Sequence, residues 1–266
     1  MKIYISVDFE GMPAINSWDE VNASKPEFEM ARQIANSQVI AACEGAIEAD
    51  AKEIWVQDAH WTGRNIDPGL MPAGVRLVRG FSKSPNDMIA LVDKTFDGVA
   101  FIGVHSESGS AKNVLGHCYS NDTVDFIKIN GKIMTETEIN SKLAAYYGVP
   151  TILVAGDQGV TQNFPDDVVK VITTSCFGGS TVMMKSIQES NAEIKDGMNA
   201  AVKQISSIKI PPLEKKFELE IKYRLHADAF KAGFYPNAKI TDDTTVKFSC
   251  EDYYEIMRAL LFLIEL

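Results

Sequence analysis

Long apolar runs and an excess of basic residues are both missing from this sequence of 266 residues. No apolar stretch approaches the roughly 20 residues of a membrane span, so we expect no membrane insertion. Acidic residues outnumber basic ones by 36 to 26, which gives a net charge of −10. We therefore expect no nucleic-acid partner, because no basic excess exists to neutralise phosphates.

Cysteine is scarce, and its spacing fits a reducing compartment better than a disulfide framework. The chain has four cysteines, which lie far apart and form no C-x-x-C pair: Cys43, Cys118, Cys176 and Cys250. Such spacing is typical of a protein from a reducing compartment. No signal-peptide pattern precedes the first apolar strand. We therefore expect a cytoplasmic protein.

Apolar runs and helical patterns alternate over the first two-thirds of the chain. A helix is expected from Pro26, and another from a capping box, Thr135-x-x-Glu138, to about residue 147. Asn130-Gly131 predicts a two-residue hairpin turn. We expect strands at 2–7, 53–57, 98–104, 124–129, 150–155 and 168–173. This alternation predicts an α/β fold with a mainly parallel, doubly wound sheet and helices on both faces.

The last third of the chain has a different pattern, with a helix around 182–206 and an extended segment at 208–216. Strands at about 217–224 and 244–248 flank a short helix near 227–233. A final helix, capped by Ser249-x-x-Asp252, is expected to reach Leu266. These elements predict a smaller α+β domain, and we place the domains at residues 1–175 and 176–266.

Side chains that can bind a metal follow the ends of three predicted strands. Asp8 and Glu10 follow the first strand and, being two residues apart, point to the same side. His60 and His105 follow the second and third strands, and Glu136 lies in the first turn of the helix after the hairpin. Sites in open α/β sheets form beyond the carboxyl ends of the strands, so we expect these side chains to converge in a catalytic domain of residues 1–175.

Two imidazoles and three carboxylates form a ligand set that suits Zn²⁺ and similar ions. Three carboxylates against two divalent cations leave one positive charge, which favours a bound hydroxide over water. A single metal would leave the cluster negative and a poorer Lewis acid. We therefore expect two Zn²⁺ per chain.

Each of these residues also has a structural interpretation that the sequence leaves open. Asp8 can cap a turn and Glu10 can face solvent. His60 and His105 can be hydrogen-bonded structural histidines, and Glu136 can be a charge favoured by the helix dipole. The shared position at strand ends favours metal binding over these alternatives.

Six short segments together resemble the M55 family of D-aminopeptidases, the type associated with dipeptide transport. Their order and spacing match across roughly residues 1–160. The segments are VDFEG at 7–11, DAH at 58–60, GVHS at 103–106, GH at 116–117, NG at 130–131 leading to Glu136, and VAGD at 154–157. The resemblance implies a dinuclear zinc aminopeptidase that hydrolyses the N-terminal residue, a D-amino acid, from short peptides.

The resemblance also assigns roles to the metal-binding side chains. It implies that Asp8 bridges the two zinc ions. Glu10 and His105 would complete the protein ligands of one ion, and His60 and Glu136 those of the other.

Catalysis and assembly follow from the same resemblance. His117 matches the catalytic histidine of the family, described there as a nucleophile. We expect metal-hydroxide attack on the scissile carbonyl, with His117 donating a proton to the leaving amine or stabilising the oxyanion. The family further implies a ring-like homo-oligomer, with a decamer as its known form.

Two other functions remain open at this point. A different metal-dependent amidohydrolase or a phosphatase would use a similar ligand set. Against a phosphatase, the sequence has no P-loop and no Arg/Lys cluster near the expected ligands to clamp a phosphate, and Arg64 is the closest candidate. Alternatively, the histidines are structural and the chain is a catalytically degenerate, ring-forming binding protein.

Overall fold

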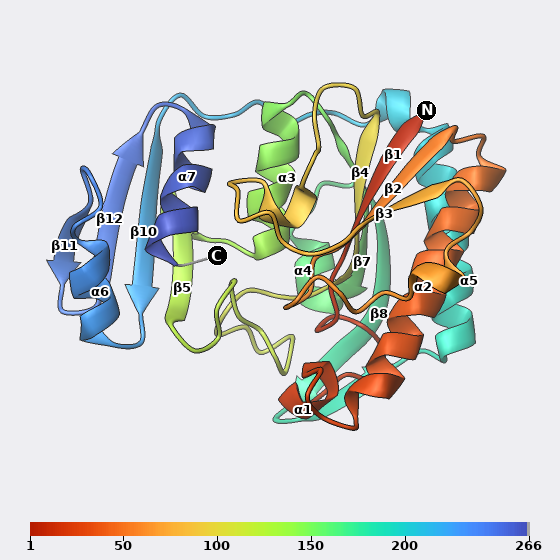
Figure 1. Cartoon of the computed structure of the whole chain (residues 1–266), viewed down its shortest axis with the longest axis horizontal. Helices are drawn as coiled ribbons and strands as arrows, with labels where there is room; N and C mark the ends of the chain where they lie inside the picture. Colours follow the sequence, from red (N-terminus) through yellow and green to blue (C-terminus); the bar gives the residue numbers. More distant parts are fainter. Residues whose placement is uncertain (265–266) are drawn as a thin grey trace.

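A seven-stranded sheet forms the larger part of the computed structural model, which describes residues 1–264 (Figure 1). Its strands pair in parallel, except that β8 and β9 are antiparallel. In spatial order they are β3 (Val75–Val78), β2 (Glu53–Asp58), β1 (Lys2–Val7), β4 (Gly98–Val104), β7 (Thr151–Asp157), β8 (Val169–Gly178) and β9 (Thr181–Met184). The expectation of a mainly parallel sheet is confirmed.

Helices cover both faces of this sheet, as expected. Successive residues of β1 point to opposite sides: Ile3 and Ile5 pack in one apolar cluster with α2 (Phe28–Glu48) and α5 (Ile187–Lys203), whereas Tyr4 packs in another with α3 (Glu136–Tyr146). The α2 helix begins two residues after Pro26, where a helix start was expected.

A second, five-stranded sheet is entirely antiparallel. Its strands are β11 (Lys239–Asp242), β12 (Thr245–Cys250), β10 (Phe217–Tyr223), β5 (Val124–Ile129) and β6 (Lys132–Ile133). The turn between β5 and β6 is the predicted hairpin, in which Asn130 and Gly131 have φ of 51° and 81°. A two-residue turn can join only antiparallel strands, and β5 and β6 pair in this way.

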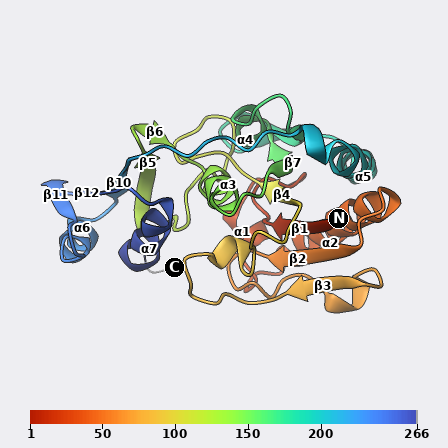
Figure 2. The same cartoon turned by 90° about the horizontal axis from the view of Figure 1, so that it is seen from above.

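The two sheets share one apolar core through α3, which lies between β4 and α7 (Tyr253–Leu263) (Figure 2). Ile139 and Leu143 of α3 are fully buried, and the Tyr253 hydroxyl donates a hydrogen bond to the Ile139 carbonyl at 2.8 Å. The remaining helices are short: α1 (Trp18–Val21), α4 (Gln158–Gln162), α6 (His226–Ala232), and the 3₁₀ turns η1 (Pro68–Leu70), η2 (Asp87–Ile89) and η3 (Ile205–Ser207).

The sheets do not follow the expected domain boundary at residue 175. Strand β8 continues across it, α5 packs on the first sheet, and β5 joins the second. The division into residues 1–175 and 176–266 therefore stays a prediction. Residues after 175 contribute to the first sheet, and residues before 175 contribute to the second.

Two helix limits differ from those expected in the last third. The helix expected at 182–206 begins only at Ile187, because β9 occupies the preceding residues and Ser186 caps α5. The final helix begins at Tyr253 with Asp252 as its cap, and its expected end at Leu266 lies outside the described residues. Within residues 1–264, no helix is long and apolar enough to cross a membrane.

Candidate metal centre

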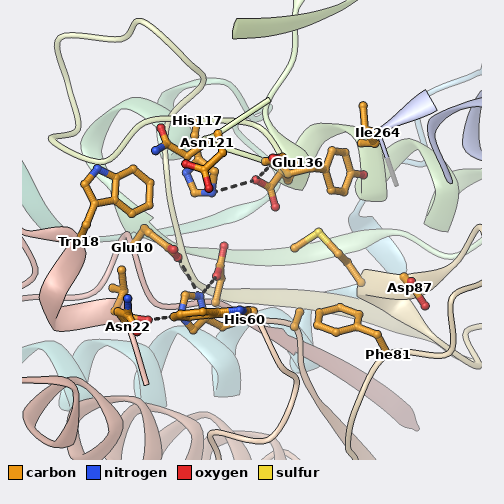
Figure 3. Close-up of a pocket in the computed structure, with 18 residues that line it drawn as sticks. Glu10, Trp18, Asn22, His60, Phe81, Asp87, His117, Asn121, Glu136 and Ile264 are labelled. Atoms are coloured by element: carbon orange, nitrogen blue, oxygen red, sulfur yellow. Dashed lines mark hydrogen bonds and ion pairs between the residues drawn. The ribbon is translucent and has the colours of Figure 1, made fainter. Parts of the chain in front are cut away.

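The five predicted ligand residues meet at the carboxyl edge of the first sheet. Asp8 and Glu10 follow β1, His60 follows β2, His105 follows β4, and Glu136 is the first residue of α3. These three strands are adjacent, because β1 lies between β2 and β4. All five side chains are buried. Figure 3 shows Glu10, His60 and Glu136 facing a common space.

One group of ligand atoms surrounds His60. Its Nδ1 atom lies 3.3 Å from Oδ1 of Asp8 and 3.2 Å from Oε2 of Glu10. Its Nε2 atom lies 2.8 Å from the Val21 carbonyl oxygen, which can only accept, so Nε2 carries the hydrogen. The nitrogen that faces the carboxylates is therefore the one free to bind a metal.

A second group surrounds His105. Its Nε2 atom lies 3.5 Å from Oδ2 of Asp8 and 3.6 Å from Oε1 of Glu136, while Nδ1 donates to the Ser106 carbonyl at 2.9 Å. The two oxygens of Asp8 thus face different groups. This is the arrangement expected of a carboxylate that bridges two metal ions.

His117 joins the second group from the loop before β5. Its ring stacks on His105 with centroids 4.3 Å apart, and its Nε2 atom lies 3.7 Å from Oε1 of Glu136. Nδ1 donates to the Leu115 carbonyl at 2.9 Å. The edge of the Trp18 ring covers His117 at a centroid distance of 5.2 Å.

The distances divide the ligands differently from the pairing that the resemblance implies. Ligand atoms lie within 4.8 Å of one another in two sets, which are Asp8, Glu10 and His60, and His105, His117 and Glu136. The resemblance instead pairs Glu10 with His105, and His60 with Glu136. Glu10 lies 3.2 Å from His60, so the distances favour grouping Glu10 with His60 over grouping it with His105.

Burial and mutual repulsion set the pKa values of the carboxylates. Burial and the charge of Glu10 raise the pKa of Asp8 to about 7. Burial is the largest single influence on Glu10 and acts to raise its pKa, but the charges of the three histidines and the hydrogen bond to His60 together hold that pKa well below its usual range. Burial acts on Glu136 in the same way, and the charges and hydrogen bonds of its neighbours together lower its pKa.

The imidazoles supply the positive charge that these carboxylates need. Burial opposes protonation of His60 and His105, but the neighbouring carboxylates raise the pKa of His105 to about 10 and that of His60 well above its usual value. The pKa of His117 is lowered by burial and by the charge of His105. A bound cation can replace these protons, so this donor set of carboxylates and imidazoles fits zinc.

Hydrogen bonds from outside the cluster hold its backbone in place. Asp157 caps α4 by accepting a hydrogen bond from the Val160 amide at 2.8 Å. It also accepts from the amide and the hydroxyl of Ser106, at 2.5 and 2.6 Å. Asn113 donates to Asp157 at 2.7 Å and to the Glu10 carbonyl at 3.2 Å. Sequence reasoning missed Asn113, because a loop asparagine gives no periodic signal.

Three further contacts orient the ligands themselves. The Tyr119 amide donates to Oε1 of Glu136 at 2.6 Å, and Phe9 stacks on the His60 ring with centroids 4.6 Å apart. Asp58 accepts from the side-chain amide of Asn65, which also donates to the His60 carbonyl at 2.7 Å. These contacts leave the rings and carboxylates little freedom to turn.

The cluster opens into a cavity of about 520 Å³, within the range of roughly 300–1,000 Å³ that is typical of small-molecule sites. Its walls include apolar side chains such as Phe81 and Met88 as well as the polar Asn22 and Asn121. A buried cluster of metal-binding groups therefore faces a space large enough for a short peptide.

A sequence model of the M55 peptidases, described as D-aminopeptidase, matches residues 1–262. The chain belongs to the M55 peptidase family. The prediction of an enzyme that hydrolyses peptide bonds is confirmed by this membership, and so is the family resemblance.

Two further comparisons bear on this M55 peptidase. A D-aminopeptidase of Bacillus subtilis (strain 168) is 27% identical over 270 residues, which span 100% of this chain and 97% of the relative. The solved structure of the Zn-dependent D-aminopeptidase DppA from Bacillus subtilis, described as a self-compartmentalizing protease, has a TM-score of 0.93 and 25% identity. The aligned region spans 100% of this chain and 97% of the chain in that structure. The expected fold class is confirmed by this likeness.

Proposed function

We propose that this chain is a dinuclear zinc aminopeptidase that removes the N-terminal residue, of D configuration, from short peptides. The observation that carries the proposal is the position of Asp8, whose two oxygens face His60 and His105 separately. The names of the two Bacillus subtilis relatives, a D-aminopeptidase and a Zn-dependent D-aminopeptidase, support the metal and the substrate class.

Asp8, Glu10 and His60 would hold one zinc ion, and Asp8, His105 and Glu136 the other. When bound, two zinc ions polarise a substrate carbonyl and lower the pKa of a coordinated water toward about 7. The buried position of the five side chains excludes bulk water and strengthens their electrostatic interaction with whatever lies between them.

His117 is placed to move the proton. Its lowered pKa keeps the ring neutral, and the bond from Nδ1 to the Leu115 carbonyl leaves the lone pair on Nε2 facing the cluster. Nε2 takes a proton from the water that attacks the carbonyl carbon. It then gives that proton to the leaving nitrogen as the C–N bond breaks. We favour this role over direct attack by the imidazole, because water is the nucleophile that the metal pair activates.

Metal analysis combined with an assay tests the proposal. Zinc-replete protein is expected to contain two zinc ions per chain and to hydrolyse D-alanyl-p-nitroanilide faster than the L form and faster than p-nitrophenyl phosphate. Preferential hydrolysis of the phosphate would support a phosphatase instead. Fewer than one zinc per chain, with no hydrolysis of either anilide, would support a non-catalytic binding protein.

The His117→Ala variant is expected to lose roughly 10²–10⁴-fold in turnover while retaining zinc, because an acid–base group contributes about that much. His226→Ala, on the exposed surface of α6, is the matched control and should keep full turnover. Loss of zinc from the His117 variant would instead make His117 a metal ligand, and unchanged turnover would remove it from the chemistry.

We also propose that the chain forms a ring-like homo-oligomer, since the relative of known structure is described as self-compartmentalizing. Light scattering should then give a particle mass that is a multiple of 29.3 kDa. A particle of 29.3 kDa would contradict the assembly but not the chemistry. A decamer and a cytoplasmic location stay predictions, the latter in keeping with four free thiols.

A further inference from the structure

The cavity extends to two sides of the metal-binding cluster. Figure 3 shows Trp18 and Asn22 at one side and Phe81 and Asp87 at the other, with His60 and Glu136 between them. A substrate carbonyl held at the cluster therefore has space in two directions. The chemical character of the two ends differs.

The first end is the one that contains His117. Trp18 lies with its ring edge against the His117 ring, and both line the cavity. Asn121, half-buried, lies four residues beyond His117 in the same loop and also lines the cavity. Its backbone is anchored by Arg224, whose Nε atom donates to the Asn121 carbonyl at 2.7 Å.

The opposite end comes from the segment between β3 and β4 and combines two apolar side chains with the buried carboxylate of Asp87, whose Oδ1 accepts from the Ser82 hydroxyl at 2.7 Å. Phe81 is half-buried and Met88 is 9% exposed, and both line the cavity. Met88 is held against α3, because Nδ2 of Asn140 lies 3.4 Å from its sulfur and donates to the Glu136 carbonyl at 2.9 Å. We call Phe81 and Met88 the apolar end, and Trp18 and Asn121 the His117 end.

The position of His117 decides which way a peptide lies. The two substituents of a scissile carbonyl carbon, the leaving nitrogen and the α-carbon of the first residue, point in opposite directions. The leaving nitrogen must lie within reach of Nε2 of His117 to receive its proton. The first residue must then extend toward the apolar end.

We infer that the apolar end binds the side chain of the substrate's first residue, and that the His117 end receives the residue after the scissile bond. Phe81 and Met88 then determine specificity for the first residue and favour apolar side chains there. This assignment rests on the proposed aminopeptidase function and adds to it the class of side chain accepted.

Two series of dipeptide amides test the assignment. One series varies the first residue, alanine or phenylalanine, before a fixed alanine, and the other varies the second residue in the same way after a fixed alanine. The first residue has the configuration that the wild-type enzyme hydrolyses faster. The measured quantity is the ratio of kcat/KM for the phenylalanine and alanine peptides within each series.

Phe81→Ala is expected to change the first-residue ratio at least tenfold in favour of phenylalanine and the second-residue ratio less than twofold. Met88→Ala should act in the same direction and serves if Phe81→Ala does not fold. Asn121→Trp should lower the second-residue ratio at least tenfold and leave the first-residue ratio within twofold. Phe234→Ala, an exposed phenylalanine after α6, is the matched control and should change neither ratio.

The opposite pattern, in which Phe81→Ala acts on the second residue, overturns the assignment while the aminopeptidase function stands. Equal effects on both series, or no effect on either, also overturn it. If the zinc-loaded wild-type enzyme hydrolyses none of the peptides, the proposed function fails and the assignment fails with it. The two failures are distinguishable, because only the second is seen in the wild-type protein.

Discussion

At the scale of single residues, the geometry of the candidate metal centre depends on which ring nitrogen of each histidine donates a hydrogen bond to the backbone. A backbone carbonyl accepts a hydrogen bond from one nitrogen of every ring, and the other nitrogen faces the carboxylates. The carbonyls belong to Val21 for His60, Ser106 for His105 and Leu115 for His117. The backbone thus fixes which nitrogen of each ring faces the carboxylates and can bind a metal.

The raised pKa values of two histidines predict that zinc competes with protons. His105, with a pKa of about 10, and His60 both hold a proton in the metal-free protein at neutral pH. Zinc must displace these protons. Its apparent affinity should therefore rise with pH from 6 to 9, by roughly tenfold per pH unit for each imidazole proton that zinc displaces. Competition against a chelator at several pH values measures this slope.

Proton release provides an independent check on that competition. Calorimetry of zinc binding in two buffers should give heats that differ by the number of protons released multiplied by the difference between the ionisation enthalpies of the buffers. Equal heats in both buffers, or an affinity independent of pH, would mean that the imidazoles are neutral before zinc arrives.

The residues of the centre were easier to predict than their arrangement. Asp8, Glu10, His60 and His105 follow strands whose apolar pattern is clear, and parallel strands end at one edge of a sheet. The sequence cannot tell which carboxylate faces which imidazole, because that depends on side-chain direction. The contact between Glu10 and His60, and the stacking of His117 on His105, became visible only in the structure.

At the scale of elements, the centre depends on a close approach of two backbones. A β-carbon on Gly103, whose φ is 72°, would lie 2.0 Å from the Asp8 carbonyl oxygen. The Asp8 amide donates to the Ile102 carbonyl at 2.8 Å, and the Gly11 amide to the Gly103 carbonyl at 2.8 Å. Only glycine permits this contact between the end of β4 and the segment that carries two of the ligands.

Gly103→Ala should therefore destabilise the protein more than Gly109→Ala. Both glycines have positive φ, but a β-carbon at Gly109 meets no atom within 4 Å. The backbone cost of about 1 kcal/mol is common to both, and the clash at Gly103 should add about 1–3 kcal/mol and reduce zinc content. Urea unfolding and metal analysis measure the two effects. Equal losses in both variants would show that the close approach relaxes freely.

The helix cap that positions Glu136 gives a second comparison at this scale. Thr135 accepts from the Glu138 amide at 3.0 Å at the start of α3, and Ser186 accepts from the Glu189 amide at 3.1 Å at the start of α5. Thr135→Ala and Ser186→Ala should each cost about 1 kcal/mol of stability. Only Thr135→Ala should weaken zinc binding, since Glu136 is the next residue. An equal loss of zinc affinity in both would contradict this role.

Short sequence patterns predicted where these helices and turns begin, but they did not predict which strands pair with one another. The Asn130-Gly131 turn and the capping box at Thr135 were visible because each is a pattern over a few residues. The pairing of β5 with β10 joins residues about ninety positions apart, as in Leu219 opposite Ile129. No short pattern encodes such a pairing, so β5 could not be assigned to its sheet from the sequence.

At the scale of the whole molecule, the proposed zinc ligands bring together segments that are distant in the chain. They span residues 8 to 136: four of them follow the strands β1, β2 and β4, and Glu136 begins α3. Removing the metal should therefore lower the stability of the folded chain as a unit. At free zinc 1,000 times its Kd, binding contributes about 4 kcal/mol, which is a shift in Tm on the order of 10 °C.

Scanning calorimetry with and without a chelator measures this shift. The Asp8→Asn variant provides the control, because it lacks the carboxylate that faces both groups and should respond little to the chelator. A wild-type Tm that stays constant after zinc has been removed would show that the metal does not stabilise the fold.

The position of α3 between the two sheets has a consequence for biosynthesis. All five ligand residues are translated within the first 136 positions, but α7, which packs against α3, comes from residues 253–263. A nascent chain thus carries the complete ligand set while one wall of its binding site is still unsupported. Loading of the metal should therefore follow the synthesis of α7, when Tyr253 reaches the Ile139 carbonyl.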